Sequence, residues 1–197
     1  MGWTTTCTYH GGGIRRYLDA EFSSDHPDYP RREILKSAMK GSTEYYAALR
    51  TTSRETDKAL TFALVVLVSY KPREPDGYTL GWKDMDESMG PYITNCPVSI
   101  LELLDPPVNE NAKIWRETCR ARAARVKRAR ERLLPGACIE LIDPLRFANG
   151  QTYARFTVEK PRRALRFRAD DGTLCSIRDI EDLDWCILSP EAESAAS

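Results

Sequence analysis

Apolar residues alternate with polar ones, or gather in short runs, along much of the first hundred residues, and this pattern is typical of β-strands. Strands are predicted at residues 3–9, 33–39, 45–49 and 60–70. The last run is almost entirely apolar, so we expect it to be the central strand of an antiparallel sheet. The helical spacing of Ile14, Leu18 and Phe22 predicts a short helix after the first strand.

A long helix is predicted next. Asn109 is a favourable N-cap with Glu110 in the first turn, and the helical pattern continues to Leu134, where Pro135 and Gly136 end it. One apolar stripe recurs at the helical period and consists of Ala112, Trp115, Cys119, Val126, Ala129 and Leu133. We expect this stripe to be buried, with Trp115 and Val126 facing the N-terminal sheet.

Five short strand-like segments separated by turn residues fill the last third of the chain. They are residues 137–142, 152–158, 164–168, 173–177 and 185–188. Short strands at such regular spacing favour an SH3-like five-stranded β-barrel. Its expected core comprises Ile139, Leu141, Phe156, Val158, Leu165, Phe167, Leu174, Ile177 and Ile187.

The predicted fold class is therefore α+β, with four segments in order. Residues 1–108 form an N-terminal domain of antiparallel sheet and helices, and residues 109–135 form a basic connecting helix. Residues 136–190 form the barrel, and residues 191–197 form a small-residue, acidic tail that we expect to be disordered.

Charge is balanced over the whole chain but not along the long helix. The chain has 29 Lys and Arg and 29 Asp and Glu, so no overall charge drives it toward nucleic acid or an anionic membrane. Between Glu110 and Leu134, however, nine basic and three acidic side chains give a local charge of +6. Four arginines there are candidates for binding a partner or nucleic acid, namely Arg120, Arg125, Arg128 and Arg132. The alternative is a solvated face neutralised by the acidic stretches at residues 74–87 and 179–184.

An acidic run at Asp84, Asp86 and Glu87 is the best candidate for metal chemistry. In an extended segment the two aspartates would point the same way, and paired carboxylates can hold a hard cation such as Mg²⁺. No histidine and no further cluster of acids accompanies them. We therefore expect these residues to be structural or partner-binding rather than catalytic.

The six cysteines contain no C-x-x-C pair, and an apolar leader is missing from the N-terminus. These features favour reduced thiols in a cytoplasmic protein without a structural zinc. No cofactor is expected, and the longest apolar stretch is too short to span a bilayer.

Several short motifs resemble an uncharacterised family found on phages, plasmids and other mobile elements. They are Gly2-Trp3-Thr4, Gly41-Ser42-Thr43-x-Tyr45-Tyr46-Ala47-Ala48, Lys83-Asp84-Met85-Asp86-Glu87-x-Met89-Gly90-Pro91, Cys96-Pro97, Trp115-Arg116-x-x-Cys119-Arg120 and Leu134-Pro135-Gly136. The resemblance carries over no activity and no functional residue. It implies a context in which small accessory proteins bind host defence or replication machinery.

The sequence contains no nucleophile–base set and no catalytic motif. The favoured function is therefore a non-enzymatic binding protein of a mobile element, an anti-defence factor or regulator that binds a host protein or nucleoprotein complex. Two alternatives stay open. One is a nucleic-acid-binding protein that uses the arginine-rich helix, and the other is a metal-dependent enzyme built around Asp84, Asp86 and Glu87. The oligomeric state is left undetermined.

Overall fold

The chain divides into two compact units, and the boundary falls inside the long helix. A computed structural model describes residues 3–8, 13–71, 79–159 and 165–188, with the side chains of residues 3–8, 70–71 and 79–84 excepted. The units are Met1–Ala123 and Ala124–Ser197. The predicted tail at residues 191–197 lies outside the described residues.

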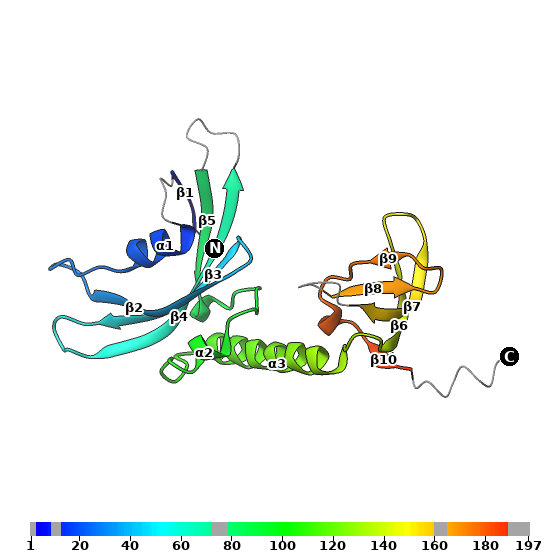
Figure 1. Cartoon of the computed structure of the whole chain (residues 1–197). Coiled ribbons are helices and arrows are strands. Elements are labelled where there is room, and N and C mark those ends of the chain that lie inside the picture. Colours follow the sequence, from blue (N-terminus) through cyan, green and yellow to red (C-terminus); the bar gives the residue numbers. More distant parts are fainter. Residues whose placement is uncertain (1–2, 9–12, 72–78, 160–164, 189–197) are drawn as a thin grey trace. The chain divides into compact units, whose positions relative to one another are not determined.

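The first unit is built on a five-stranded antiparallel sheet in the order β1-β5-β4-β3-β2 (Figure 1). Its elements are β1 (Trp3–Thr8), α1 (Ile14–Phe22), β2 (Arg31–Lys40), β3 (Glu44–Thr52), β4 (Ala59–Lys71), β5 (Thr79–Asp86), η1 (Glu87–Met89), α2 (Val98–Leu101) and the start of α3 (Glu110–Arg132). The apolar run in β4 is the central strand, as expected. The hydrophobic pattern did not identify β5, which pairs with β1 on one side and β4 on the other.

Both faces of this sheet are covered in its middle, which explains the uninterrupted apolar runs at residues 45–49 of β3 and 62–68 of β4. On one face, Leu18 and Phe22 of α1 pack against residues such as Tyr45 and Val66. The opposite face carries Tyr46, Ala48, Ala63 and Val65, which pack against α2 and α3 through Ile100, Leu101, Trp115 and Cys119. Successive strand residues point to opposite faces, so each strand supplies both layers.

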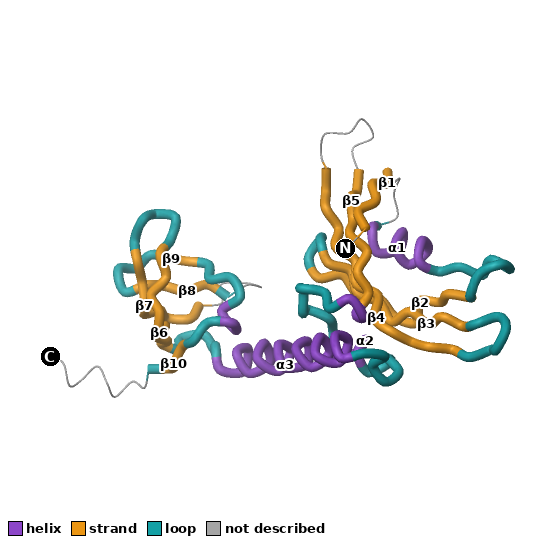
Figure 2. The backbone as a smooth tube through the Cα atoms, turned by 180° about the vertical axis from the view of Figure 1, so that it is seen from behind, coloured by secondary structure: helices purple, strands orange, loops and turns teal. Residues whose placement is uncertain are grey.

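The second unit holds the five strands predicted from the C-terminal pattern, in the antiparallel order β10-β6-β7-β8-β9 (Figure 2). They are β6 (Cys138–Arg146), β7 (Thr152–Glu159), β8 (Arg166–Ala169), β9 (Leu174–Cys175) and β10 (Trp185–Ile187), with η2 (Ile180–Asp182) before the last. Within the described residues β9 and β10 do not pair, so the sheet is open and the SH3-like barrel is not confirmed. The edge strands β9 and β10 have only two and three residues, so they offer few backbone groups for the hydrogen bonds that would close a barrel.

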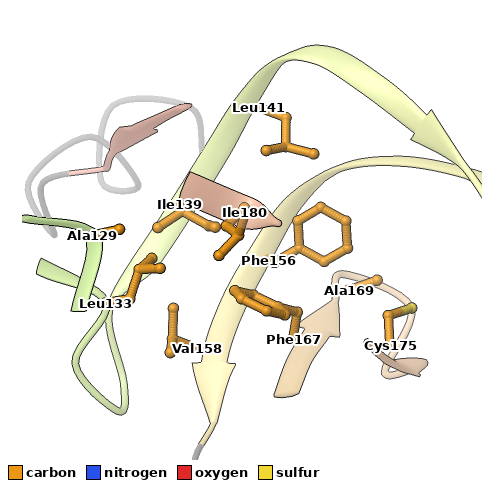
Figure 3. Close-up of a cluster of buried hydrophobic side chains, with 10 residues drawn as sticks. All are labelled: Ala129, Leu133, Ile139, Leu141, Phe156, Val158, Phe167, Ala169, Cys175 and Ile180. Atoms are coloured by element: carbon orange, nitrogen blue, oxygen red, sulfur yellow. The ribbon is translucent and has the colours of Figure 1, made fainter. Parts of the chain in front are cut away.

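A single apolar cluster fills one side of this open sheet, and the long helix contributes to it. Figure 3 shows its ten buried side chains, which are Ala129, Leu133, Ile139, Leu141, Phe156, Val158, Phe167, Ala169, Cys175 and Ile180. The expected core was wrong for Leu174 and Ile187, which are 49% and 39% exposed. Leu174 alternates with the inward-facing Cys175, and Ile187 is the last residue of an edge strand.

Within the part of the chain that the structure covers, no helix has both the length and the apolar character needed to cross a bilayer.

Candidate binding face on the long helix

The predicted N-cap starts α3. The Oδ1 atom of Asn109 accepts a hydrogen bond from the backbone N–H of Ala112 at 2.9 Å, and Glu110 follows in the first turn. This bond satisfies one of the amide groups that have no partner within the helix. Residues 110–132 then form a regular helix, slightly shorter than the sequence pattern predicted.

The apolar stripe of α3 is shared between the two cores. Trp115 and Cys119 are buried in the cluster on the N-terminal sheet, and the indole Nε1 of Trp115 donates to the backbone carbonyl of Ile93 at 2.8 Å. Ala129 and Leu133 belong to the C-terminal cluster. Val126 is half-buried and lies in the second unit, so its expected packing on the N-terminal sheet is not confirmed.

Arg116 is the basic side chain of α3 that is fully withdrawn from solvent. It is 4% exposed and forms two hydrogen-bonded contacts with the carboxylate of Glu87, Nε to Oε2 and Nη2 to Oε1, both at 2.5 Å. Its Nη1 donates to the backbone carbonyl of Asp105. Glu87 is 1% exposed, and its Oε1 also accepts the backbone N–H of Ala63 at 3.1 Å. The pair therefore joins α3, η1 and β4 within the first unit.

Arg122, which interrupts the apolar stripe, takes part in a half-buried polar network. Its Nε donates to Oδ1 of Asn95 at 2.7 Å, and Nδ2 of Asn95 donates to Oε2 of Glu44 at 3.0 Å. The hydroxyl of Tyr46 donates to the same carboxylate at 2.8 Å, and burial of Tyr46 raises its pKa. Arg122 thus contributes to a hydrogen-bonded network that links α3 to Asn95 and, through it, to Glu44 of β3.

Two of the four candidate arginines have partners inside the second unit. The Nη2 atom of Arg125 lies 3.3 Å from Oδ1 of Asp182. The guanidinium of Arg132 lies over the ring of Trp185, 4.9 Å from its centroid, at cation–π distance. Neutralisation by the stretch at residues 179–184, the alternative raised by the sequence, therefore holds for Arg125.

The other two candidates point into solvent. Arg120 and Arg128 are exposed, as is Arg130, and none of them forms an ion pair with a described residue. Lys127 lies 4.0 Å from Glu131 in an exposed pair of the kind that contributes little to stability. The exposed cations of α3 within the second unit are thus Lys127, Arg128 and Arg130. Arg128 and Arg130 lie about 160° apart around the helix axis, with Lys127 between them. Arg120 is an exposed cation of the first unit.

The two acids of the candidate acidic site whose side chains are described, Asp86 and Glu87, have separate structural roles. The side chain of Asp84 lies outside the described residues, and its backbone pairs with Trp3 and Val66 within the sheet. Asp86 caps η1 by accepting the backbone N–H of Met89 at 3.2 Å, and Glu87 is committed to Arg116. In the described ranges, no three His, Cys, Asp or Glu side chains are grouped as a metal would require.

Residues 106–180 match a family model described as a domain of unknown function (DUF6927). The match takes in α3 and most of the C-terminal sheet, through Ile180 of η2. Neither the curated proteins nor the solved structures contain a match to this chain. The family match agrees with the sequence prediction of an uncharacterised domain, and the mobile-element context stays a prediction.

Proposed function

We propose that the protein is a non-enzymatic binding protein whose exposed cations on α3 bind an acidic surface of a host protein or nucleoprotein complex. The observation that carries this proposal is that some arginines of α3 are paired with acids of the same chain and others are not. Arg116 and Arg125 have acidic partners within the chain, whereas Arg128 and Arg130 stay exposed without an ion pair among the described residues.

The charge balance of the chain determines what such a face can do. Because the net charge is zero, long-range attraction toward a polyanion is weak and binding must depend on local contacts. Arginine suits this role because its planar guanidinium donates two parallel hydrogen bonds to a carboxylate or a phosphate. A role in anti-defence or regulation on a mobile element rests on the motif resemblance alone and belongs to the same proposal.

Nucleic acid is the second candidate for the partner, since phosphate oxygens accept the same bidentate hydrogen bonds. The two candidates differ in salt dependence, because each lost phosphate contact reduces the log–log salt slope by about 0.7–0.9. The burial of Glu87 against Arg116 gives no support to a metal-dependent enzyme centred on Asp84, Asp86 and Glu87.

The test is a pulldown from a bacterial lysate with the full chain, run with and without nuclease. The variant Arg128→Glu/Arg130→Glu should lose the partner that the unmodified protein recovers. The control Lys36→Glu/Lys58→Glu changes the net charge equally at two exposed positions of the first unit and should keep it. Arg120→Glu is tested separately.

Thermal melting of each variant shows whether it is folded. Equal recovery of the partner by Arg128→Glu/Arg130→Glu and by the control would contradict the proposal. Recovery that disappears after nuclease treatment would instead select nucleic acid. Arg125 and Arg132 are left unchanged. Replacing them would break their contacts with Asp182 and Trp185, and a loss of binding could then come from a loss of stability.

A further inference from the structure

A polar pocket of about 380 Å³ lies at the end of the N-terminal sheet, on the face that α2 and α3 cover further along. Tyr46, Ala48 and Ala63 occupy the covered part of this face. Beyond them the same face becomes polar, because β3 and β4 continue past the helices. The pocket thus begins where the helical cover of the sheet ends.

Two cross-strand rows form the floor of this pocket. Arg31, Thr52 and Ala59 are opposite one another on β2, β3 and β4, and so are Glu33, Arg50 and Thr61. Asp105, in the segment between α2 and α3, forms a wall, and its Oδ2 accepts the backbone N–H of Thr61 at 2.7 Å. Side chains two residues apart on a strand share a face, so both rows point into the pocket.

The pocket contains opposite charges that do not pair with each other. Arg31, Glu33 and Arg50 form no ion pair with any described residue, although Glu33 and Arg50 are direct cross-strand neighbours. Thr61 is only 4% exposed, and its hydroxyl has no hydrogen-bond partner within the described ranges. Buried hydroxyls normally have a partner, so the hydroxyl of Thr61 is available to a ligand.

The charges and polarity of the residues that line the pocket determine which chemical class of ligand fits it. A simple anion would meet the carboxylates of Glu33 and Asp105, and a simple cation would meet the two guanidinium groups of Arg31 and Arg50. Ala59 is the one apolar residue among the described residues that line the pocket, so an extended apolar ligand would find little surface to cover. The volume is at the lower end of the range for small-molecule sites.

We propose that this pocket binds a small zwitterion of the amino-acid type. Its carboxylate is held by Arg31 and Arg50, and its ammonium group faces Glu33 and Asp105. The proposal is independent of the binding face on α3, since it rests on residues of the first unit alone.

The test is a ¹H–¹⁵N NMR titration of the full chain with four probes at constant ionic strength. Glycine and γ-aminobutyrate carry both charges, whereas sodium acetate and ethylammonium chloride each supply one. The zwitterions should give saturable shifts at the backbone amides of Arg50, Thr52 and Thr61, and the single ions should not.

Arg50→Gln should weaken zwitterion binding by about tenfold or more, the loss expected for one charge-assisted contact. Lys58→Gln is the matched control, since it removes one exposed positive charge in the turn between β3 and β4 without touching the pocket lining. The proposal is overturned if acetate reproduces the shifts, if no probe gives saturable shifts, or if Arg50→Gln binds like the control. The same spectra show that each variant is folded.

Discussion

Replacing Glu87 by glutamine tests how strongly the buried ion pair with Arg116 supports the N-terminal unit. The change keeps the size of the side chain but removes its negative charge and one of its two acceptor oxygens. Arg116, at 4% exposed, would then hold a positive charge in the interior opposite a neutral amide. Removing one partner of such a pair costs about 3–5 kcal/mol, since the remaining charge stays buried and uncompensated. The amide oxygen of glutamine can still accept the backbone N–H of Ala63 in the position of Oε1, so the expected loss comes from the contact with Arg116.

Urea unfolding of the full chain, followed by far-UV circular dichroism, measures this loss. With a slope of about 2 kcal/mol per molar urea, a loss of about 4 kcal/mol moves the unfolding midpoint of the first unit by about 2 M. Glu131→Gln is the matched control, because that glutamate is 61% exposed and lies 4.0 Å from Lys127. Its loss should stay below about 0.5 kcal/mol.

A double variant separates the charge effect from the loss of shape. Adding Arg116→Met to Glu87→Gln removes the stranded charge, so part of the lost stability should return. If Glu87→Gln shifts the midpoint no further than Glu131→Gln does, the reasoning about the buried pair is refuted.

Two further predictions concern α3. Burial raises the pKa of Cys119 to about 11 from the ordinary 9.0, so the unfolded chain loses this thiol proton at lower pH than the folded chain. This thiol should therefore contribute about 2 kcal/mol to the fall in the free energy of unfolding between pH 9 and 11, beside the contributions of Cys96, Tyr45 and Tyr46, whose pKa values burial also raises. Cys119→Ala should make the fall shallower by that amount, and an equally steep fall in urea titrations would contradict this. Arg132→Ala removes the contact with Trp185 and should lower stability by about 0.5–1 kcal/mol, with a change in indole fluorescence. Arg128→Ala, at an exposed position, should change neither the free energy of unfolding nor the indole fluorescence. Equal changes in the two variants would exclude a role for the contact between Arg132 and the ring of Trp185.

Much of the sheet structure could be predicted because its signals are local. Turn residues such as Asn149-Gly150 and Asp171-Gly172 separate the C-terminal strands, and alternation within each strand marks the buried side. The strand β5 could not be found this way. Its segment contains glycine and charged residues, and its extended form depends on pairing with both β1 and β4. Such long-range pairing overrides local propensity.

The roles of the charged residues were harder to foresee. Arg116 lies one turn after the buried Ala112, a hint that it borders the apolar stripe, but its partner Glu87 is 29 residues away in the sequence. Arg125 and Asp182 are 57 residues apart. Sequence composition reveals that cations gather on one helix, whereas only the folded chain separates the paired ones from the exposed ones.

The shared stripe of α3 has a consequence for where the protein can be cut. A fragment starting at residue 136, the predicted border of the barrel, would lose Ala129 and Leu133 and leave one side of the C-terminal core uncovered. The partner fragment would keep a helical end with nothing to pack against, and isolated helical segments of such length are marginal in water. The family match begins at residue 106, ahead of the helix, and so covers the helix together with most of the C-terminal sheet. A fragment that keeps the C-terminal core intact thus includes the helix, and a cut inside the helix would remove core residues from one of the two units.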